Sequence, residues 1–134
     1  MSVSVQWDND EKSVIYYSID DPWKWIEVHQ AIDEIFAMMD GVDHVVDAIV
    51  HFKSGIKIKT GMLTEGRRLL MRQHTRSGMT VVVTSNALFR SVYNMIRVTY
   101  PRANLYTAFS FATTLDEARE LIQQRRQRQE TFES

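Results

Sequence analysis

The chain has 134 residues, of which 44% are hydrophobic and 25% charged, and its formal net charge is −1. This composition is typical of one globular domain, and five glycines and two prolines leave little room for a collagen-like or disordered segment. The absence of cysteine excludes disulfides, thiolate metal ligands and a cysteine nucleophile.

A β-hairpin is predicted at the start of the chain. Residues 3–7 alternate apolar and polar side chains, which indicates a strand with one buried face. Residues 8–12 have turn chemistry, and residues 13–19 are again rich in β-branched and aromatic side chains. The two runs are therefore expected to pair as antiparallel strands.

A helix is predicted next. Asp20 or Asp21 is expected to cap it, and Pro22 suits its first turn because the missing N–H has no helical partner there. Gly41 is expected to end it. Its apolar side chains recur at steps of three and four and form one stripe: Trp25, Val28, Ile32, Ile35, Phe36 and Met39.

The rest of the chain alternates strands with helices. Strands are predicted over residues 44–51, 80–84 and 105–109, and helices over residues 63–76 and 87–100. A last helix opens with a capping box in which Thr114 and Glu117 satisfy free amides at the helix start. Its core face is expected to hold Leu115, Ala118, Leu121 and Ile122. Residues 123–134 have almost no apolar side chain and are expected to fray into a charged tail.

This order, β-β-α-β-α-β-α-β-α, predicts a single α/β domain over residues 1–122 with a mixed, mainly parallel sheet and an N-terminal antiparallel hairpin strand. Half-polar strand faces indicate that helices cover one side of the sheet better than the other. We therefore expect a homodimer that uses the hairpin face, with Tyr17 or Trp7 at the contact. One core is expected to bury Ile35, Val45, Ile49, Val81 and Val83.

Four stretches of this chain resemble the STAS, or SpoIIAA-like, domains (sulfate-transporter and anti-sigma-factor-antagonist domains). They read VVDAIVHFKSG, LTEGRRLLMRQ, MTVVVTSNALFRSVYNMI and FATTLDEARELI, and with the element order they extend the resemblance over roughly residues 3–122. The resemblance implies a SpoIIAA-like fold and a regulatory binding module. Members are often switched by phosphorylation of a Ser that follows an Asp at the start of the second helix. This chain has Lys57-Ile58-Lys59-Thr60-Gly61-Met62 there, without that pair, and Thr60 offers the hydroxyl.

No motif in the sequence predicts a catalytic or cofactor site. The glycine-rich phosphate loops and the GxSxG nucleophile turn do not occur, and no two His residues have the spacing of metal ligands on a helix. Asp47 and His51 fall on one face of a predicted strand, but ~13 Å apart, which is too far for one metal ion. We expect no cofactor and no metal. His51 is either an acid–base group or an ordinary half-exposed histidine at a strand end.

The charges are strongly segregated along the chain. Residues 1–50 sum to −9, residues 51–112 to +9 and residues 113–134 to −1. Arg68, Arg72 and Arg76 are expected to form one stripe on the helix over residues 63–76. This stripe either docks an acidic partner or is neutralised by acids of the same molecule. The candidate residues for binding a partner or an anion are Lys53, Lys57, Lys59, Thr60, Arg68, Arg72, Arg76, Arg90 and Arg97.

Two functions are therefore expected. The first is a non-enzymatic regulatory or protein-interaction module that docks a protein partner or forms a homodimer. The alternative is a small anionic-ligand-binding or enzymatic α/β domain that uses the basic loop over residues 53–60. Nucleic acid is not an expected partner because the pI is 6.4 and the acidic half opposes it. No signal peptide is visible in residues 1–30 and no stretch approaches ~18 apolar residues, so a cytoplasmic location without membrane association is expected.

Overall fold

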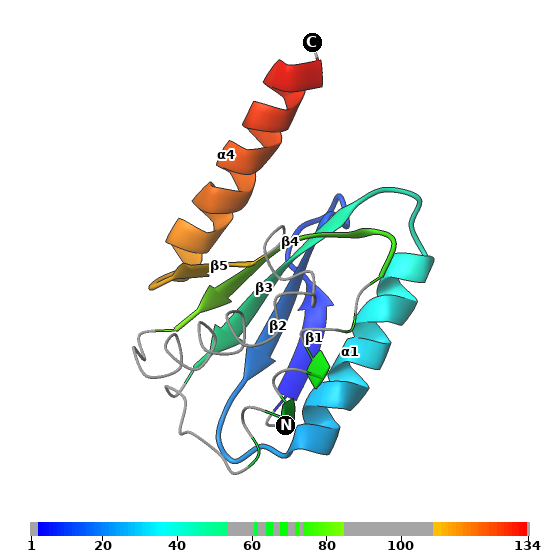
Figure 1. The fold of residues 1–134 in the computed structure, drawn as a ribbon, viewed down its shortest axis with the longest axis vertical. Helices are drawn as coiled ribbons and strands as arrows, with labels where there is room; N and C mark the ends of the chain where they lie inside the picture. Colours follow the sequence, from blue (N-terminus) through cyan, green and yellow to red (C-terminus); the bar gives the residue numbers. More distant parts are fainter. Residues whose placement is uncertain are drawn as a thin grey trace.

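The computed structural model contains five strands and two helices among the residues that it describes. Those residues are 3–53, 61, 64–65, 68–69, 72, 74–84 and 109–133, with the side chains of 109 and 129–133 left aside. The elements are β1 (Val3–Trp7), β2 (Val14–Ile19), α1 (Trp25–Asp40), β3 (Val46–Phe52), β4 (Ser77–Val83), β5 (Phe109–Ala112) and α4 (Leu115–Glu133) (Figure 1).

The strands form one mixed sheet in the order β1-β2-β3-β4-β5. β1 pairs antiparallel with β2, and the three other pairs are parallel. Asn9 holds the turn between β1 and β2, because its Oδ1 accepts the backbone N–H of Ser13 at 3.0 Å. The predicted α/β class, the hairpin and the mainly parallel sheet are thereby confirmed.

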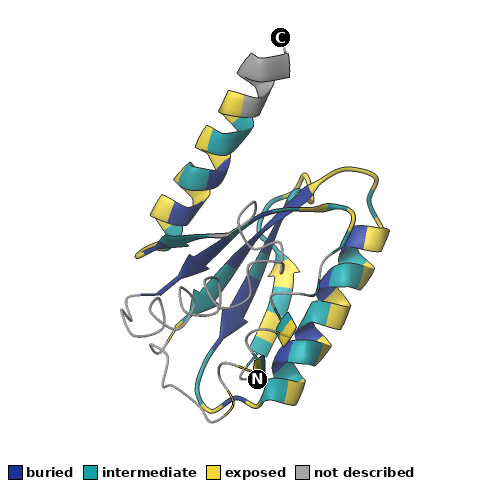
Figure 2. Ribbon diagram, viewed as in Figure 1, coloured by how far each residue is buried: buried dark blue, intermediate teal, exposed yellow. Residues whose placement is uncertain are grey.

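The two helices lie on opposite faces of the sheet, so the hydrophobic core has two parts (Figures 1 and 2). Under α1, the buried cluster consists of Ile15, Tyr17, Ile19, Trp23, Val28, Ala31, Ile35, Met39 and Val46. Under α4, it consists of Val14, Ile49, Met79, Val81, Val83, Ala112, Ala118 and Ile122. Neighbouring residues of a strand point to opposite faces, which is why Ile35 is buried apart from Ile49, Val81 and Val83 rather than in one core with them.

Two expectations were wrong, namely that Val45 is buried in the core and that Tyr17 lies at a dimer contact. Val45 is 58% exposed, because β3 begins one residue later, at Val46, and Val45 precedes the hydrogen-bonded ladder. Tyr17 is buried beneath α1, where its hydroxyl donates to the backbone carbonyl of Val28 at 3.4 Å. Tyr17 is therefore inside the domain and does not provide a dimer contact, whereas Trp7 packs half-buried against the same cluster.

The start of α1 also differs from the prediction. The helix begins at Trp25, and the carboxylate of Glu27 accepts the backbone N–H of Lys24 at 2.9 Å. This contact sets the first turn three residues after Pro22, so neither Asp20 nor Asp21 caps the helix. Its end after Asp40, with Gly41 as the capping residue, is as predicted.

The later elements are shifted relative to their predicted bounds. Residues 72 and 74–76 are not helical, so Arg68, Arg72 and Arg76 do not share one helical stripe. β5 covers Phe109–Ala112 instead of residues 105–109, because it pairs with Thr80–Val83 and ends where the last helix is capped. The predicted helix over residues 87–100 and the predicted strand residues 105–108 lie outside the described residues.

The last helix is longer than expected. Half of its predicted capping box is present, since the Glu117 N–H donates to Thr114 Oγ1 at 3.1 Å. The Glu117 carboxylate accepts from Thr113, one residue before the predicted cap, taking its N–H at 3.2 Å and its hydroxyl at 2.9 Å. Ala118 and Ile122 are buried, and Leu115 and Leu121 pack against them, as predicted. Residues 123–133 continue the helix, so the expectation of a frayed tail there was wrong.

Candidate functional site

A buried carboxylate lies at the amino end of the parallel strands. Asp47 in β3 is 6% exposed, and its Oδ1 accepts the backbone N–H of Met79 at 2.7 Å. The register of β3 and β4 shifts here, since Val46 pairs with Ser77 and Ala48 with Thr80. β4 thus has one extra residue opposite Asp47, and the carboxylate bonds a backbone amide of this bulge.

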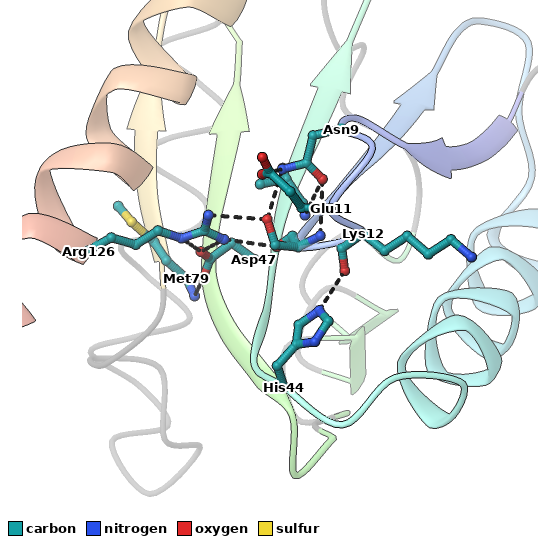
Figure 3. Close-up of polar contacts among 9 residues, drawn as sticks. Asn9, Glu11, Lys12, His44, Asp47, Met79 and Arg126 are labelled. Atoms are coloured by element: carbon teal, nitrogen blue, oxygen red, sulfur yellow. Dashed lines mark hydrogen bonds and ion pairs between the residues drawn. The ribbon is translucent and has the colours of Figure 1, made fainter.

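Arg126 of α4 completes the site, which we call the Asp47 cluster and define as Asn9, Ser13, Asp47, Met79 and Arg126 (Figure 3). The Arg126 Nε donates to Asp47 Oδ2 at 2.9 Å, and its Nη2 lies 2.7 Å from the same oxygen. The guanidinium also donates to the Ser13 carbonyl at 2.9 Å and to the Ser13 hydroxyl at 3.2 Å. Asn9 Nδ2 donates to the same hydroxyl at 2.8 Å.

The Asp47 cluster has a structural role, because it holds several elements of the fold together. Each carboxylate oxygen of Asp47 is already engaged by a donor, which leaves the group poorly suited to acid–base chemistry. The cluster ties α4 to the turn between β1 and β2 and to both central strands. Ligands of open α/β sheets bind instead at the carboxyl ends of the strands.

A second polar pair lies nearer those carboxyl ends. The Tyr16 hydroxyl lies 2.7 Å from His51 Nδ1, with the rings tilted at 58°. Burial lowers the pKa of His51, and the positive charge of Lys53 lowers it further. Burial also raises the pKa of Tyr16, partly offset by the positive charge of Arg119. Both rings are therefore uncharged at neutral pH, and His51 is a hydrogen-bonded, half-exposed histidine.

A pocket of about 200 Å³, partly open to solvent, lies between α1 and the sheet. We call it the α1 pocket. Its described lining includes Trp23, Trp25, Phe36, Val50, Phe52 and Arg72. Of the lining residues that the structure describes, Arg72 alone carries a charge. The pocket can therefore accept an apolar molecule and offers it one cation.

Arg72 is held by α1. Its Nη1 donates to the carbonyl of His29 at 3.1 Å, and its Nη2 pairs with the Asp33 carboxylate. The guanidinium carbon lies 5.4 Å from the ring centre of Phe36. An acid of the same molecule thus neutralises Arg72, and these contacts hold its partly exposed side chain where it lines the α1 pocket.

Among the other candidate residues that the structure describes, Arg68 is connected to Arg72 through Glu65 and His29. Arg68 is exposed and pairs with Glu65 at 3.0 Å, and Glu65 also lies 3.0 Å from His29. Arg76 is half-buried in the turn before β4, and Lys53 is exposed after β3. The candidates outside the described residues are Lys57, Lys59, Thr60, Arg90 and Arg97.

Sequence reasoning missed both the Asp47 cluster and the α1 pocket. A signal for the first was present, because Asp47 interrupts an apolar strand and Arg126 follows Ile122 by four residues on the inner face of α4. The α1 pocket leaves no such signal, since its walls come from α1, β2, β3 and β4 together.

Within the described ranges, no three His, Asp or Glu side chains are placed to hold a metal ion together. In the same ranges, no helix has the length and apolar character needed to cross a membrane. Comparison with known protein families, with curated proteins and with solved structures finds no match to this chain.

Proposed function

We propose that this protein is a non-enzymatic regulatory or protein-interaction module of STAS-like fold that docks a protein partner or self-associates. The mixed five-stranded sheet and the four STAS-like stretches support the fold. The interaction function is supported above all by the second half of α4.

That half of α4 is a polar helix held in a fixed direction. After Ile122 it presents exposed side chains at Gln123, Gln124, Gln127 and Arg128. Figure 1 shows it extending away from the sheet. From Gln123 to Arg128 the side chains are all polar, so this stretch gains little from core burial, and a helix of this kind is suited to bridging to another domain or molecule. Arg126 anchors it through the Asp47 cluster, which presents this surface rigidly.

Sedimentation velocity of the full chain over a range of protein and salt concentrations tests self-association through α4. We expect a dimer that weakens with added salt, because exposed charges are screened beyond ~8 Å at physiological ionic strength. Arg128→Glu should weaken the dimer, and Gln30→Glu, on the exposed side of α1, is the matched control. A monomer at all concentrations contradicts self-association and leaves docking of a different protein.

The α1 pocket favours a second function, the binding of a small molecule. It has an apolar lining and one cation, whereas the basic loop first expected to hold an anion lies outside the described residues apart from Lys53. A thermal-shift screen with nucleotides, phosphates, lipid head groups and small organic acids separates the two functions. Stabilisation by several degrees with one compound supports ligand binding, and no response across the screen supports the interaction module.

A further inference from the structure

We infer that the α1 pocket binds a small carboxylic acid with an aromatic or aliphatic body, its carboxylate on Arg72. This inference rests on the second function proposed above, the binding of a small molecule. It names the ligand class and the residue that recognises it.

The size and lining of the α1 pocket define the body of the ligand. Its volume of about 200 Å³ exceeds that of apolar cavities of about 150 Å³ in which benzene binds. A molecule of about ten non-hydrogen atoms therefore fits. Trp23, Trp25 and Phe52 present aromatic surface to it, and Val50 and Ile32 add aliphatic surface.

The position of Arg72 defines the polar end of the ligand. Its side chain is 27% exposed, and its contacts with the His29 carbonyl and the Phe36 ring hold the planar guanidinium in place. A guanidinium held in this way matches a carboxylate in geometry as well as in charge. The bound acid would thus direct its apolar body into the α1 pocket and its carboxylate to the rim.

Asp33 is the competitor that a ligand must replace. Its side chain is 67% exposed, so its pairing with Arg72 is of the solvent-exposed kind that contributes little to stability. A ligand carboxylate reaching Arg72 from the apolar side exchanges one anion for another and leaves the guanidinium paired. Removing the charge of Asp33 should therefore strengthen binding.

Calorimetry of the full chain with 3-phenylpropanoate and with 3-phenylpropanol tests the inference at neutral pH. The acid should bind at least about tenfold more tightly than the alcohol, because hydrogen bonds to charged groups are the stronger ones. Binding should change the fluorescence of Trp23 and Trp25, which line the α1 pocket. Val50→Phe should weaken the binding of both compounds by filling it.

Variants of the rim identify the recognising residue. Arg72→Gln should reduce the affinity for the acid to that for the alcohol, and Asp33→Asn should raise the affinity for the acid alone. Arg68→Gln is the matched control, since Arg68 is exposed, pairs with Glu65 and does not line the α1 pocket. If Arg72→Gln does not fold, Arg72→Lys retains the positive charge but lacks the planar guanidinium that can bind a carboxylate through two N–H groups. It should therefore give an intermediate affinity for the acid.

The outcomes separate this inference from the function on which it rests. Equal binding of acid and alcohol, unchanged by Asp33→Asn, overturns the role of Arg72 but keeps the α1 pocket as a ligand site. Failure of both compounds to bind at millimolar concentration overturns the ligand class. Stabilisation by a nucleotide or a phosphate in the thermal-shift screen would then show a ligand function located elsewhere.

Discussion

Gly78 of β4 lies directly against the Asp47 side chain of β3. A Cβ atom at Gly78 would overlap the Asp47 Oδ1 and lie 2.7 Å from Val45 Cγ1. Asp47 cannot withdraw without losing its bonds to Met79 and Arg126. Position 78 therefore requires glycine for reasons of space.

Gly78→Ala should accordingly reduce the free energy of unfolding by roughly 2–4 kcal/mol, since it disturbs a buried, hydrogen-bonded carboxylate. Gly41→Ala is the matched control, because a Cβ there would lie 3.4 Å from the Met38 carbonyl oxygen, an ordinary contact. Urea denaturation of both variants measures the difference. Equal stability of the two would contradict the steric role of Gly78.

His51 makes stability depend on pH. Burial lowers its pKa below the ordinary value of 6.5, so the unfolded chain binds a proton more readily than the folded chain. The stabilising contribution is complete above pH 6.5 and is lost as the pH falls through 6.5 and the lower folded pKa. His51→Gln should therefore flatten the loss of stability between pH 7 and pH 5, measured by urea denaturation.

The matched control for this pH effect is His44→Gln, because His44 is an exposed histidine and His51 is not. Both variants remove one histidine side chain, and only that of His51 is half-buried and hydrogen-bonded to Tyr16. A pH profile that is the same for His51→Gln and His44→Gln would show that the Tyr16–His51 pair does not carry the effect.

At the level of elements, α4 is held by two different kinds of contact. Its first half buries Ala118 and Ile122 against the sheet, whereas its second half is held by Arg126 in the Asp47 cluster. Arg126→Met should lower the free energy of unfolding by about 2 kcal/mol, because Asp47 stays buried without its cation. The loss should be no larger than this because Arg126 itself is partly exposed.

Hydrogen exchange localises this effect. In Arg126→Met, the amides of residues 123–133 should exchange faster while those of residues 115–122 stay protected. Gln30→Met is the control, since Gln30 is exposed on α1 and outside the Asp47 cluster. Uniform protection along α4 in the Arg126 variant would show that the cluster does not hold its second half.

The same elements show what the sequence can predict. β1 and the core face of α4 were predicted correctly because their apolar spacing is complete within a few residues. β5 and the second half of α4 were wrong because distant contacts set them; Asp47 and Arg126, for example, lie 79 residues apart. The start of α1 was wrong for a local reason, since the Glu27 carboxylate accepts the Lys24 N–H and places the first turn there. The α1 pocket could not be predicted at all, because no local pattern records the space between a helix and a sheet.

For the molecule as a whole, β4 serves both faces of the sheet: Met79, Val81 and Val83 are buried under α4, and Val82 lines the α1 pocket on the other face. Val82 is 6% exposed and pairs with Val50 and Phe111 in the neighbouring strands. Val82→Asp would bury an unpaired carboxylate and should prevent cooperative folding. Val45→Asp is the control, since Val45 is 58% exposed, and should unfold cooperatively near the wild-type midpoint. Circular dichroism during thermal unfolding measures both.

Residues of the acidic first 50 residues and of the basic segment 51–112 form ion pairs with each other at α1. Arg72 pairs with Asp33, His74 lies 2.6 Å from Asp40, and Arg68 pairs with Glu65 within its own segment. The acidic half of the chain therefore neutralises part of the basic half inside one molecule. This arrangement favours intramolecular neutralisation over docking as the role of Arg68 and Arg72.

Replacing Arg68, Arg72 and Arg76 together with Gln tests that conclusion. The change should lower the free energy of unfolding by about 0.5–1 kcal/mol, a small value because Asp33 and Arg68 are mostly exposed. Arg72→Gln alone should account for most of it, and the loss should shrink in high salt as the ion pairs are screened. Urea denaturation at low and high salt measures both effects. An unchanged or raised midpoint would instead contradict neutralisation within the molecule and would keep the hypothesis that these arginines dock an acidic partner.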